Sequence, residues 1–545
     1  MFESLREAAA IHKRKLGQRL LHSPLHPLYL KLAGSPQLRE YRQFIAALAR
    51  TAPAPEWFSG QMAAWTYRPR ISVLMAVRNP RPEWFRQAVE SVLAQIYPDW
   101  QLCIVDDASG QPVQAPDDPR ISFAALQARA GISGALNSAL EMAAGEYICV
   151  LDHDDFLSAD ALYRVVEALQ QQRYEVLYSD EDYVDENGLP VRPNLKPDWS
   201  PELLSNCMYV GHLVIASRLL VDRVGGFRSE FDGAQDYDLA LRLTDQPATG
   251  VAHIPHILYH WRQHQESIAQ RPDAKPWAND SGRRAVEDML RRRGWDAKVM
   301  DAEIPTRYHV VRNLARRERA SIIMRSGSGK VLEQNTGYED FEIVRDVSKA
   351  TGSYLVFLHA DVRPQKPDWL ANLLVAAQRP EVGVVGAKLV YPNGAIQHSG
   401  IVTGMPGGAG YPGRGLFQSD YWRWLDYTRN VTAVSSACLV TRKQVFESVG
   451  GFDDAFRSDL ADVDFCLRVR QAGFEIILEQ RAGLIHEEQE RAQPSSEEQE
   501  LFRKRWHAIL EKPDPYYSRY LRLDREDTSL RIPTESASGG SPPVA

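Results

Sequence analysis

The sequence contains no apolar segment long enough to cross a membrane. A membrane-spanning helix needs about 20 consecutive apolar residues, whereas the longest apolar runs, 71–77 and 147–151, have the length of β-strands. A cleavable leader is not expected either, because Lys13, Arg14 and Lys15 interrupt the apolar residues near the N-terminus. We therefore expect a cytoplasmic protein.

Cysteine is scarce, and its spacing excludes the common metal and disulfide frameworks. The five cysteines are odd in number and scattered, and no two of them have CxxC spacing. Because most of them lie in apolar runs, we predict buried, reduced thiols, as in a reducing compartment. The residues concerned are Cys103, Cys149, Cys207, Cys438 and Cys466.

A strong positive charge is also absent. The formal net charge of −7 argues against a basic nucleic-acid binder, and we expect no nucleic-acid partner. The first predicted strand leads into 78–82, a proline-rich segment without glycine, whereas a nucleotidyltransferase would carry a glycine-rich phosphate loop there. With 44% hydrophobic and 25% charged residues over 545 positions, the chain is typical of a globular protein of two or three domains.

Basic residues are concentrated near the N-terminus, in a region, 1–66, that we predict to be helical. Residues 1–50 contain nine Lys or Arg against three Glu. Apolar residues recur there at roughly helical spacing, at Leu5, Ile11, Leu16 and Leu20. Two interpretations stay open. Residues 1–50 contact the inner face of the plasma membrane peripherally, or they pack on the main body and expose a basic face to solvent.

Strands and helices alternate from residue 71 onward, which predicts a parallel sheet covered on both faces. Asp106-Asp107 follows the second strand, and Asp152-His153-Asp154-Asp155 follows the third. Ligands of such sheets bind beyond the carboxyl ends of the strands, so the aspartates mark the expected site. The predicted elements are strand 71–77, helix 84–94, strand 101–105, helix 133–144 and strand 147–151.

The second half of the chain repeats motifs of the first half. The matching segments are 145–154 with 352–361, 225–227 with 450–452, 235–238 with 461–464, and His260 with His486. The second copy is shorter, because one strand and one helix are missing before its first block, and it has Arg345-Asp346 in place of Asp106-Asp107. We predict a first domain at 67–310, a truncated copy at 311–520 and a disordered tail at 521–545.

The repeated residues allow both a chemical and a purely structural interpretation. Asp152 and Asp154 suit Mg²⁺ or Mn²⁺, which prefer oxygen ligands and bind diphosphates, but Asp-rich turns are common. Asp236 precedes a helical run, so it is either a helix cap or a general base. His260 is either a structural histidine at a strand end or a further metal ligand. Asp107 either binds a ribose or base, or forms a turn.

Taken together, the motifs resemble the GT-A glycosyltransferases of family 2, specifically the tandem two-domain type of bacterial polysaccharide, O-antigen and flagellin glycosylation. The resemblance covers roughly residues 70–520. It implies two tandem α/β domains with a Rossmann-like sheet, the second truncated, after an N-terminal helical segment. The motifs that carry it are 71–75, 91–95, 106–109, 151–155, 178–182, 196–199, 235–239, 259–262, 384–389, 397–400, 462–468 and 514–517.

The resemblance also implies an activity and roles for particular residues. An inverting, metal-dependent reaction would move a sugar from a nucleotide-diphosphate sugar to a hydroxyl of a glycan, lipid-linked or protein acceptor. Asp236 would be the catalytic base, and Mn²⁺ or Mg²⁺ would be held by Asp152, Asp154 and His260. The donor sugar is open, and the resemblance suggests a deoxyhexose such as rhamnose, carried on thymidine diphosphate. The residues expected to bind substrates are Asp106, Asp107, Asp152, Trp199 and Gln235.

The chain departs from the family pattern in two places. The segment 131–134 is one residue shorter than usual, which affects the expected donor pocket. The second copy has His359-Ala360-Asp361 instead of a D-x-D, although it keeps the candidates Asp361, Asp462 and His486. We expect this copy to be weak, inactive or acceptor-binding. The alternative for the whole chain is a non-catalytic scaffold that binds nucleotide sugars or glycans, which would need no base at Asp236.

Overall fold

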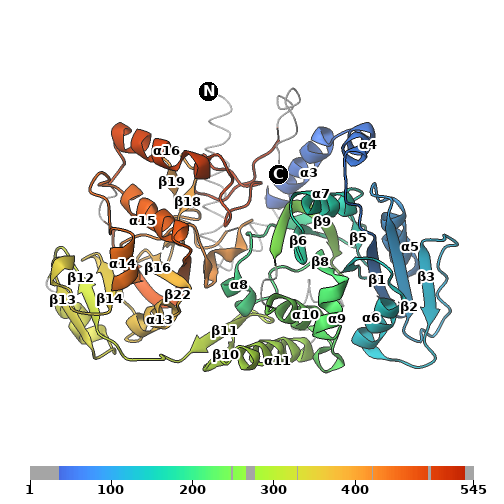
Figure 1. Ribbon diagram of the computed structural model, residues 1–545, viewed down its shortest axis with the longest axis horizontal. Helices are drawn as coiled ribbons and strands as arrows, with labels where there is room; N and C mark the ends of the chain where they lie inside the picture. The colour runs from blue at the N-terminus through green and yellow to red at the C-terminus, as the bar shows by residue number, and fades with distance from the viewer. Residues whose placement is uncertain are drawn as a thin grey trace. The chain divides into compact units, whose positions relative to one another are not determined.

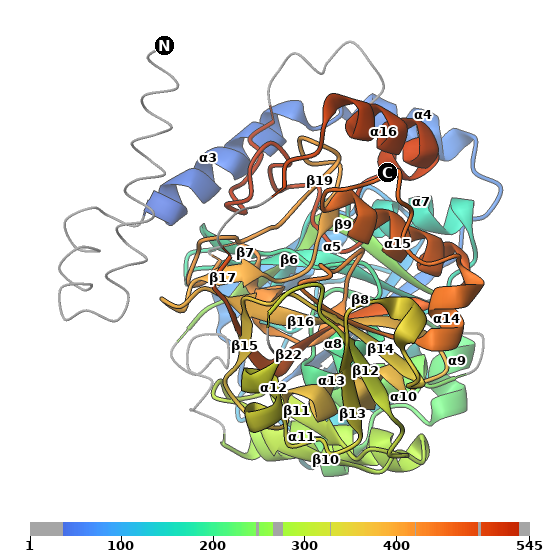
Figure 2. The ribbon, with the colours of Figure 1, turned by 90° about the vertical axis from the view of Figure 1, so that its left-hand side faces the viewer.

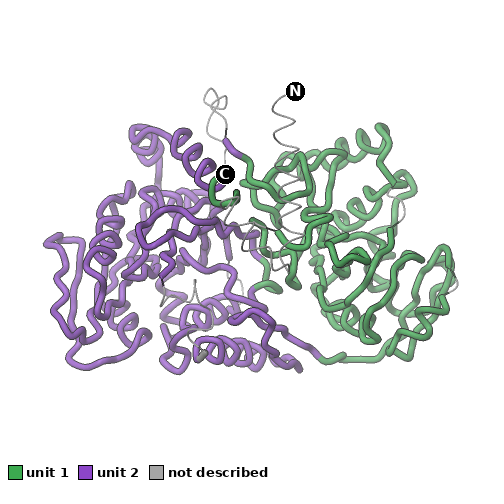
Figure 3. The backbone as a smooth tube through the Cα atoms, turned by 180° about the vertical axis from the view of Figure 1, so that it is seen from behind, with its two compact units in different colours: residues 1–39, 200–203, 313–531 green, residues 40–199, 204–312, 532–545 purple. Residues whose placement is uncertain are grey.

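The computed structural model describes residues 36–246, 250–264, 276–327, 329–419, 421–488 and 492–533. The chain divides into two compact units (Figure 3). The N-terminal unit, unit 2 of the figure, comprises residues 40–199, 204–312 and 532–545, and the C-terminal unit, unit 1, comprises residues 1–39, 200–203 and 313–531. The predicted basic stretch up to residue 35 lies outside the described residues, as do residues 534–545 of the predicted tail.

The N-terminal unit is built on one mixed sheet (Figure 1). Its strands are β1 (Ile71–Val77), β2 (Trp100–Asp106), β3 (Ile121–Ala125), β4 (Tyr147–Val150), β5 (Phe156–Leu157), β6 (Val176–Val184), β7 (Pro190–Asn194), β8 (Val214–Ser217) and β9 (Val251–Arg262). The order is β3-β2-β1-β4-β8-β6-β9-β5, with β7 beside β6. Strands β1 to β4 pair in parallel, whereas β8 is antiparallel to both β4 and β6. The predicted α/β sheet is confirmed.

Helices cover both faces of this sheet, because its central strands are apolar on both sides. Val73 and Met75 of β1 pack with α5 and α7, whereas Leu74 packs with α6 in a separate cluster. The alternation follows from the two-residue period of a strand. The helices of this unit and its boundary segment are α5 (Pro82–Leu93), α6 (Gly131–Met142), α7 (Ala161–Gln171), α8 (Pro201–Asn206), α9 (Arg218–Val224), α10 (Gln235–Thr244) and α11 (Pro276–Arg292), followed by the strand pair β10 (Ala297–Asp301) and β11 (Tyr308–Arg312).

The C-terminal unit repeats this architecture in reduced form (Figure 2). Its main strands are β12 (Ala320–Ile323), β13 (Phe341–Val344), β14 (Tyr354–Leu358), β15 (Val362–Pro364), β16 (Val382–Val390), β21 (Cys438–Arg442) and β22 (Glu475–His486). The order β13-β12-β14-β21-β16-β22-β15 matches that of the first sheet, strand for strand, except that no described strand corresponds to β3. Only the short 3₁₀ helix Val347–Lys349 lies between β13 and β14. The predicted tandem, truncated copy is therefore confirmed.

The remaining elements of the C-terminal unit are short strands and peripheral helices. The strands are β17 (Ile396–His398), β18 (Val402–Thr403), β19 (Ala409–Gly410) and β20 (Arg429–Asn430). The helices are α12 (Lys330–Asn335), α13 (Trp369–Ala377), α14 (Lys443–Ser448), α15 (Leu460–Gln471) and α16 (Ser496–Leu510). After α16 the chain is placed up to residue 533, and Leu521 and Leu530, inside the predicted tail, are buried and form an isolated β-bridge.

Two helices, α3 (Pro36–Thr51) and α4 (Pro55–Ala63), are described within the predicted helical region 1–66. Tyr41 of α3 is buried, and its hydroxyl donates a hydrogen bond of 2.6 Å to Asp182 Oδ2. Phe58 of α4 joins the core cluster that contains Tyr163. This described part of the region thus packs on the protein body.

The structure also bears on the cysteines and on membrane insertion. All five cysteines are buried and none forms a disulfide, as predicted. Among the described helices, none is both long enough and apolar enough to span a bilayer.

Candidate active site

The first aspartate pair, Asp106 and Asp107, lies at the end of β2, close to the N-terminus of α6. Asp106, the last residue of β2, accepts a hydrogen bond from Ser109 N–H at 3.0 Å. Asp107 is buried, and its carboxylate accepts hydrogen bonds from Ala130 N–H at 2.5 Å and Gly131 N–H at 3.2 Å. Asp107 therefore anchors the N-terminus of α6 to the end of β2. These bonds use part of the carboxylate's hydrogen-bonding capacity.

Three carboxylates meet in the turn between β4 and β5. Asp152, Asp154 and Asp155 each offer one oxygen within 4.8 Å of the other two. Asp155 is buried, and both its oxygens are engaged, with Arg262 N–H at 2.7 Å and the Tyr259 hydroxyl at 2.6 Å. Asp155 thus fixes the turn, while the half-buried Asp152 and Asp154 are the residues suited to hold a hard divalent cation. An all-oxygen donor set of this kind fits Mg²⁺ or Mn²⁺.

The electrostatic environment of the two half-buried carboxylates differs. Burial raises the pKa of Asp152, an effect opposed by the charge of His212 and reinforced by those of Asp154 and Asp236. Burial also acts on Asp154, but the hydrogen bond from His264 and the nearby imidazoles outweigh it, so the pKa of Asp154 is lowered. Asp154 is therefore held in the charged form that a cation requires.

His260 does not belong to the carboxylate cluster found among the described residues. Its Nδ1 lies 2.6 Å from Asp182 Oδ1, and its ring stacks on Phe156, its partner in the β5–β9 pair. The imidazole that reaches the cluster is His264, whose Nε2 lies 2.9 Å from Asp154 Oδ2. His260 was proposed as a further metal ligand from the chemistry of imidazole and from the family resemblance, but the histidine that contacts a carboxylate of the cluster is His264, two residues after the end of β9.

The candidate base, Asp236, lies in the first turn of α10 and is half-buried. Its charge contributes to the raised pKa of Asp152, after burial itself, so the two carboxylates share one electrostatic environment. The neighbouring Gln235 accepts a hydrogen bond from Gly233 N–H at 2.9 Å through its side chain. Trp199 is half-buried near Tyr209, with the two ring centroids 6.5 Å apart. Asp236 is thus linked electrostatically to Asp152, although it is not part of the carboxylate cluster found among the described residues.

Sequence reasoning did not predict a network of charged residues, Glu181, Lys196 and His212, near the carboxylate cluster. Glu181 accepts a hydrogen bond from His212 N–H at 2.6 Å, and the Lys196 ammonium lies 3.4 Å from the same carboxylate. Burial lowers the pKa of His212, but the interaction with Glu181 outweighs it and raises the pKa to about 9. A positive charge therefore lies near Asp152 and Asp155. Glu181 and Lys196 fall within recognised motifs, whereas no sequence feature singled out His212.

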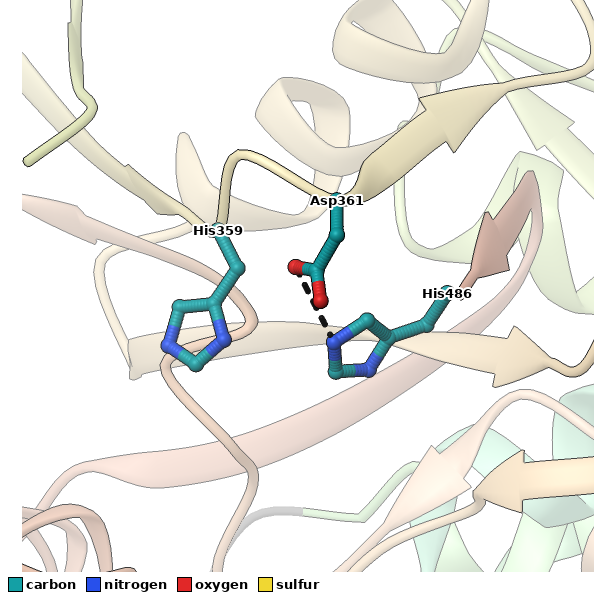
Figure 4. A group of neighbouring side chains, drawn as sticks. All are labelled: His359, Asp361 and His486. Carbon is teal, nitrogen blue, oxygen red and sulfur yellow. Dashed lines mark ion pairs between the residues drawn. The ribbon is translucent and has the colours of Figure 1, made fainter. Parts of the chain in front are cut away.

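In the C-terminal unit, the candidates do not form one group. Asp361 and His486 lie together with His359 (Figure 4). Asp462, in the first turn of α15, is buried and accepts a hydrogen bond from Ser436 N–H at 2.8 Å. Burial raises the pKa of Asp462 to about 7. Its counterpart in the repeat, Asp236, is only half-buried.

Comparisons with known proteins find related sequences. The model of the family described as "Glycosyl transferase family 2" matches residues 72–228. The chain is 34% identical over 541 residues to the uncharacterized protein y4gI of Sinorhizobium fredii, covering 85% of this chain and 59% of that protein. It is 32% identical over 569 residues to the O-antigen biosynthesis protein RfbC of Myxococcus xanthus, covering 91% of this chain and 44% of that protein.

A shorter match covers about a third of the chain. The "UDP-Glc:alpha-D-GlcNAc-diphosphoundecaprenol beta-1,3-glucosyltransferase WfgD" of Escherichia coli is 26% identical over 206 residues, which cover 36% of this chain and 79% of that protein. The chain spans about half the length of the two relatives that it matches over most of its own length. The carboxylate cluster of Asp152, Asp154 and Asp155 lies within the matched residues 72–228. Residues 72–228 of the N-terminal unit therefore match the glycosyl transferase family 2.

Proposed function

We propose that the N-terminal unit transfers a sugar from a nucleotide-diphosphate sugar to an acceptor hydroxyl, with inversion at the anomeric carbon. The observation that carries this proposal is the cluster of Asp152, Asp154 and Asp155 at the carboxyl end of β4, in the electrostatic environment of Asp236. Its position within a family 2 domain supports the assignment.

On the donor side, Asp152 and Asp154 would hold Mn²⁺ or Mg²⁺. Such an ion, when bound, neutralises the charge of a diphosphate leaving group. Asp155 and Tyr259 keep the turn in place through their 2.6 Å hydrogen bond, and His264 orients Asp154. Asp106 and Asp107 fix the neighbouring turn, where we place the nucleoside of the donor.

On the acceptor side, Asp236 takes the proton of the attacking hydroxyl. The hydroxyl oxygen forms a bond to the anomeric carbon while the bond from that carbon to the diphosphate oxygen breaks on the opposite face. The proton ends on Asp236, and the nucleoside diphosphate leaves as an anion. Gln235 and Trp199 are proposed to position the acceptor beside this carboxylate.

We further propose that the acceptor is a lipid-linked glycan in the assembly of a bacterial surface polysaccharide such as O-antigen. The names of RfbC and WfgD support this class, since one names O-antigen biosynthesis and the other a diphosphoundecaprenol-linked acceptor. A protein acceptor such as flagellin is the alternative. Such a reaction would take place in the cytoplasm, at the inner face of the plasma membrane.

The test is the release of nucleoside diphosphate by the full-length chain across a panel of nucleotide sugars, with Mn²⁺, Mg²⁺ or EDTA. We expect one donor to be hydrolysed in a metal-dependent way without any acceptor. Asp154→Ala should reduce this release to the level seen with EDTA. Asp236→Asn should lower turnover by at least about 100-fold while donor binding persists, because only the base is lost.

A matched control is Asp222→Asn, an aspartate on α9 whose side chain is 48% exposed and pairs with Arg218. It should retain wild-type turnover. Release that is insensitive to EDTA and to Asp154→Ala would contradict the assigned site. If no donor binds or is hydrolysed, the non-catalytic scaffold becomes the better explanation.

A further inference from the structure

The turn that holds the carboxylate cluster in the N-terminal unit has a different composition in the C-terminal unit. Between β14 and β15 the chain reads His359-Ala360-Asp361, so a histidine stands where the aligned first copy has Asp152. The turn is also one residue shorter. It comprises residues 359–361, between Leu358 and β15, whereas the turn of the first copy comprises residues 152–155, between Leu151 and β5. The register pairs Val362 of β15 with His486, the last residue of β22.

This shorter turn brings a strand-end histidine directly onto the aspartate. Asp361 Oδ1 lies 3.3 Å from His486 Nε2 (Figure 4). His359, Asp361 and His486 each offer one ligand atom within 4.8 Å of the other two. The His486 side chain is only 4% exposed, so its ring is held by the fold, whereas His359 is exposed. In the first copy, the residue that pairs with β5 in the same way, His260, faces Asp182 instead.

The spacing suits a metal ion. Ligand atoms about 2.0–2.1 Å from a tetrahedral zinc lie about 3.3 Å from one another, which is the distance between Asp361 and His486. The two imidazole rings meet at 74° with centroids 5.7 Å apart, so they do not stack face to face. The third ligand atom, on the exposed His359, lies within 4.8 Å of the other two.

We propose that the C-terminal unit binds a divalent transition-metal ion through His359, Asp361 and His486. Two imidazoles and one carboxylate favour Zn²⁺, Co²⁺ or Ni²⁺ over Mg²⁺ and Ca²⁺, because nitrogen donors suit the former ions and oxygen donors the latter. The two copies of the duplicated turn would therefore select different metals. Three protein ligands leave a fourth position for water or for a group of a bound molecule.

The test uses the full-length chain, stripped of metal and carrying Asp154→Asn to disable the N-terminal cluster. Co²⁺ is titrated and followed by its visible absorption, which reports nitrogen ligation and low coordination number. We expect one equivalent of Co²⁺ to bind, to be displaced by Zn²⁺, and to resist millimolar Mg²⁺. His359→Asn and His486→Gln should each weaken Co²⁺ binding by at least about tenfold. Changing a residue that only supports a metal ligand already lowers metal affinity by about that factor.

The deciding variant is His359→Asn, because its exposed side chain can be changed without disturbing the core. Its matched control is His507→Asn on α16, a histidine whose side chain is 71% exposed. Zn²⁺ should raise the melting temperature of the parent and of the His507 variant, but not of the His359 variant. Unchanged Co²⁺ binding in His359→Asn, or displacement by Mg²⁺ as effective as by Zn²⁺, would overturn the proposal.

Discussion

At the scale of single residues, identical side chains acquire different roles from their surroundings. Asp154 and Asp155 are neighbours in the sequence, yet Asp155 is buried with both oxygens engaged, whereas the half-buried Asp154 contacts His264. Asp236 and Asp462 occupy the same position of the repeat, but only Asp462 is buried. Burial, which a single sequence does not reveal, thus separates residues suited to catalysis from residues that support the fold.

Asp462 gives a pH-dependent prediction. Its folded-state pKa is raised from 3.8 to about 7, so the native state binds this proton more tightly than the unfolded chain. The contribution of Asp462 to stability is therefore lost as pH rises from about 4 to 7, by up to about 4 kcal/mol. We expect Asp462→Asn to become progressively more stable than the wild type over that interval, as measured by urea unfolding of the full-length chain.

The control for this measurement is Asp454→Asn, at an exposed position of the same unit. Its stability relative to the wild type should change little with pH. If the difference between Asp462→Asn and the wild type were the same at pH 4 and pH 7, the carboxyl group would titrate normally in the folded protein.

At the scale of elements, the repeated motifs contain a shared structural clamp. Asp238 of α10 is fully buried and pairs with Arg242, one turn later, which also donates to the carbonyls of Val224 and Gly226. Asp464 and Arg468 of α15 form the same arrangement with the carbonyls of Val449 and Gly451. Much of the sequence similarity between the copies therefore reflects how a helix is fixed to the preceding glycine turn.

We predict that removing either arginine destabilises its unit. Arg242→Met and Arg468→Met each leave a buried carboxylate with fewer partners, and the cost should approach about 3–5 kcal/mol, since an uncompensated buried charge is involved. Asp238 also pairs with Arg228, and Asp464 also pairs with Arg505. Because each carboxylate would keep this second arginine, we expect the loss of unfolding free energy to lie toward the lower end of that range. The measurement is chemical unfolding of the two variants against the wild type.

Arg223→Met is a suitable control, because this arginine is exposed at the end of α9. It should change the free energy of unfolding by only a few tenths of a kcal/mol. Equal stability of Arg242→Met and Arg223→Met would show that the clamp is not required.

How far the sequence predicts the elements depends on whether local signals define them. The strand at 71–77 was predicted with its observed bounds, because it is a buried apolar run flanked by polar residues. The helix predicted from Ser133 begins at Gly131, because Asp107 accepts hydrogen bonds from the amides of Ala130 and Gly131 across more than twenty positions. The contact of His264 with Asp154 joins residues 110 positions apart, and the spacing of motifs does not reveal it.

At the scale of the whole chain, the two units share a sheet order, but among the described residues the C-terminal unit has no counterpart of β3 and α6. In the N-terminal unit these elements complete the turn around Asp107, where we place the nucleoside. The second unit has Arg345-Asp346 there, and Asp346 caps a short 3₁₀ helix through Ser348 N–H. The duplication of the fold was visible in the sequence, because the strand ends, glycine turns and helix clamps all recur in order.

This difference predicts the nucleotide stoichiometry. We expect one nucleoside diphosphate to bind per chain, as measured by calorimetry in the presence of Mn²⁺. Asp107→Ala should weaken this binding, because it releases the N-terminus of α6 as well as the carboxylate itself. Two equivalent sites per chain would show that the shortened unit binds nucleotide without β3 and α6.

The missing strand has a consequence of another kind. Without a counterpart of β3, β13 has only β12 as a partner among the described strands, so one row of its backbone amides and carbonyls is left at a sheet edge. Such an edge can template the addition of a strand from another molecule and lead to aggregation. In β13 this risk is limited by its length of four residues and by the charged residues Asp340, Glu342 and Arg345 in and around it. The short, charged edge of β13 thus offers little template for the addition of a further strand.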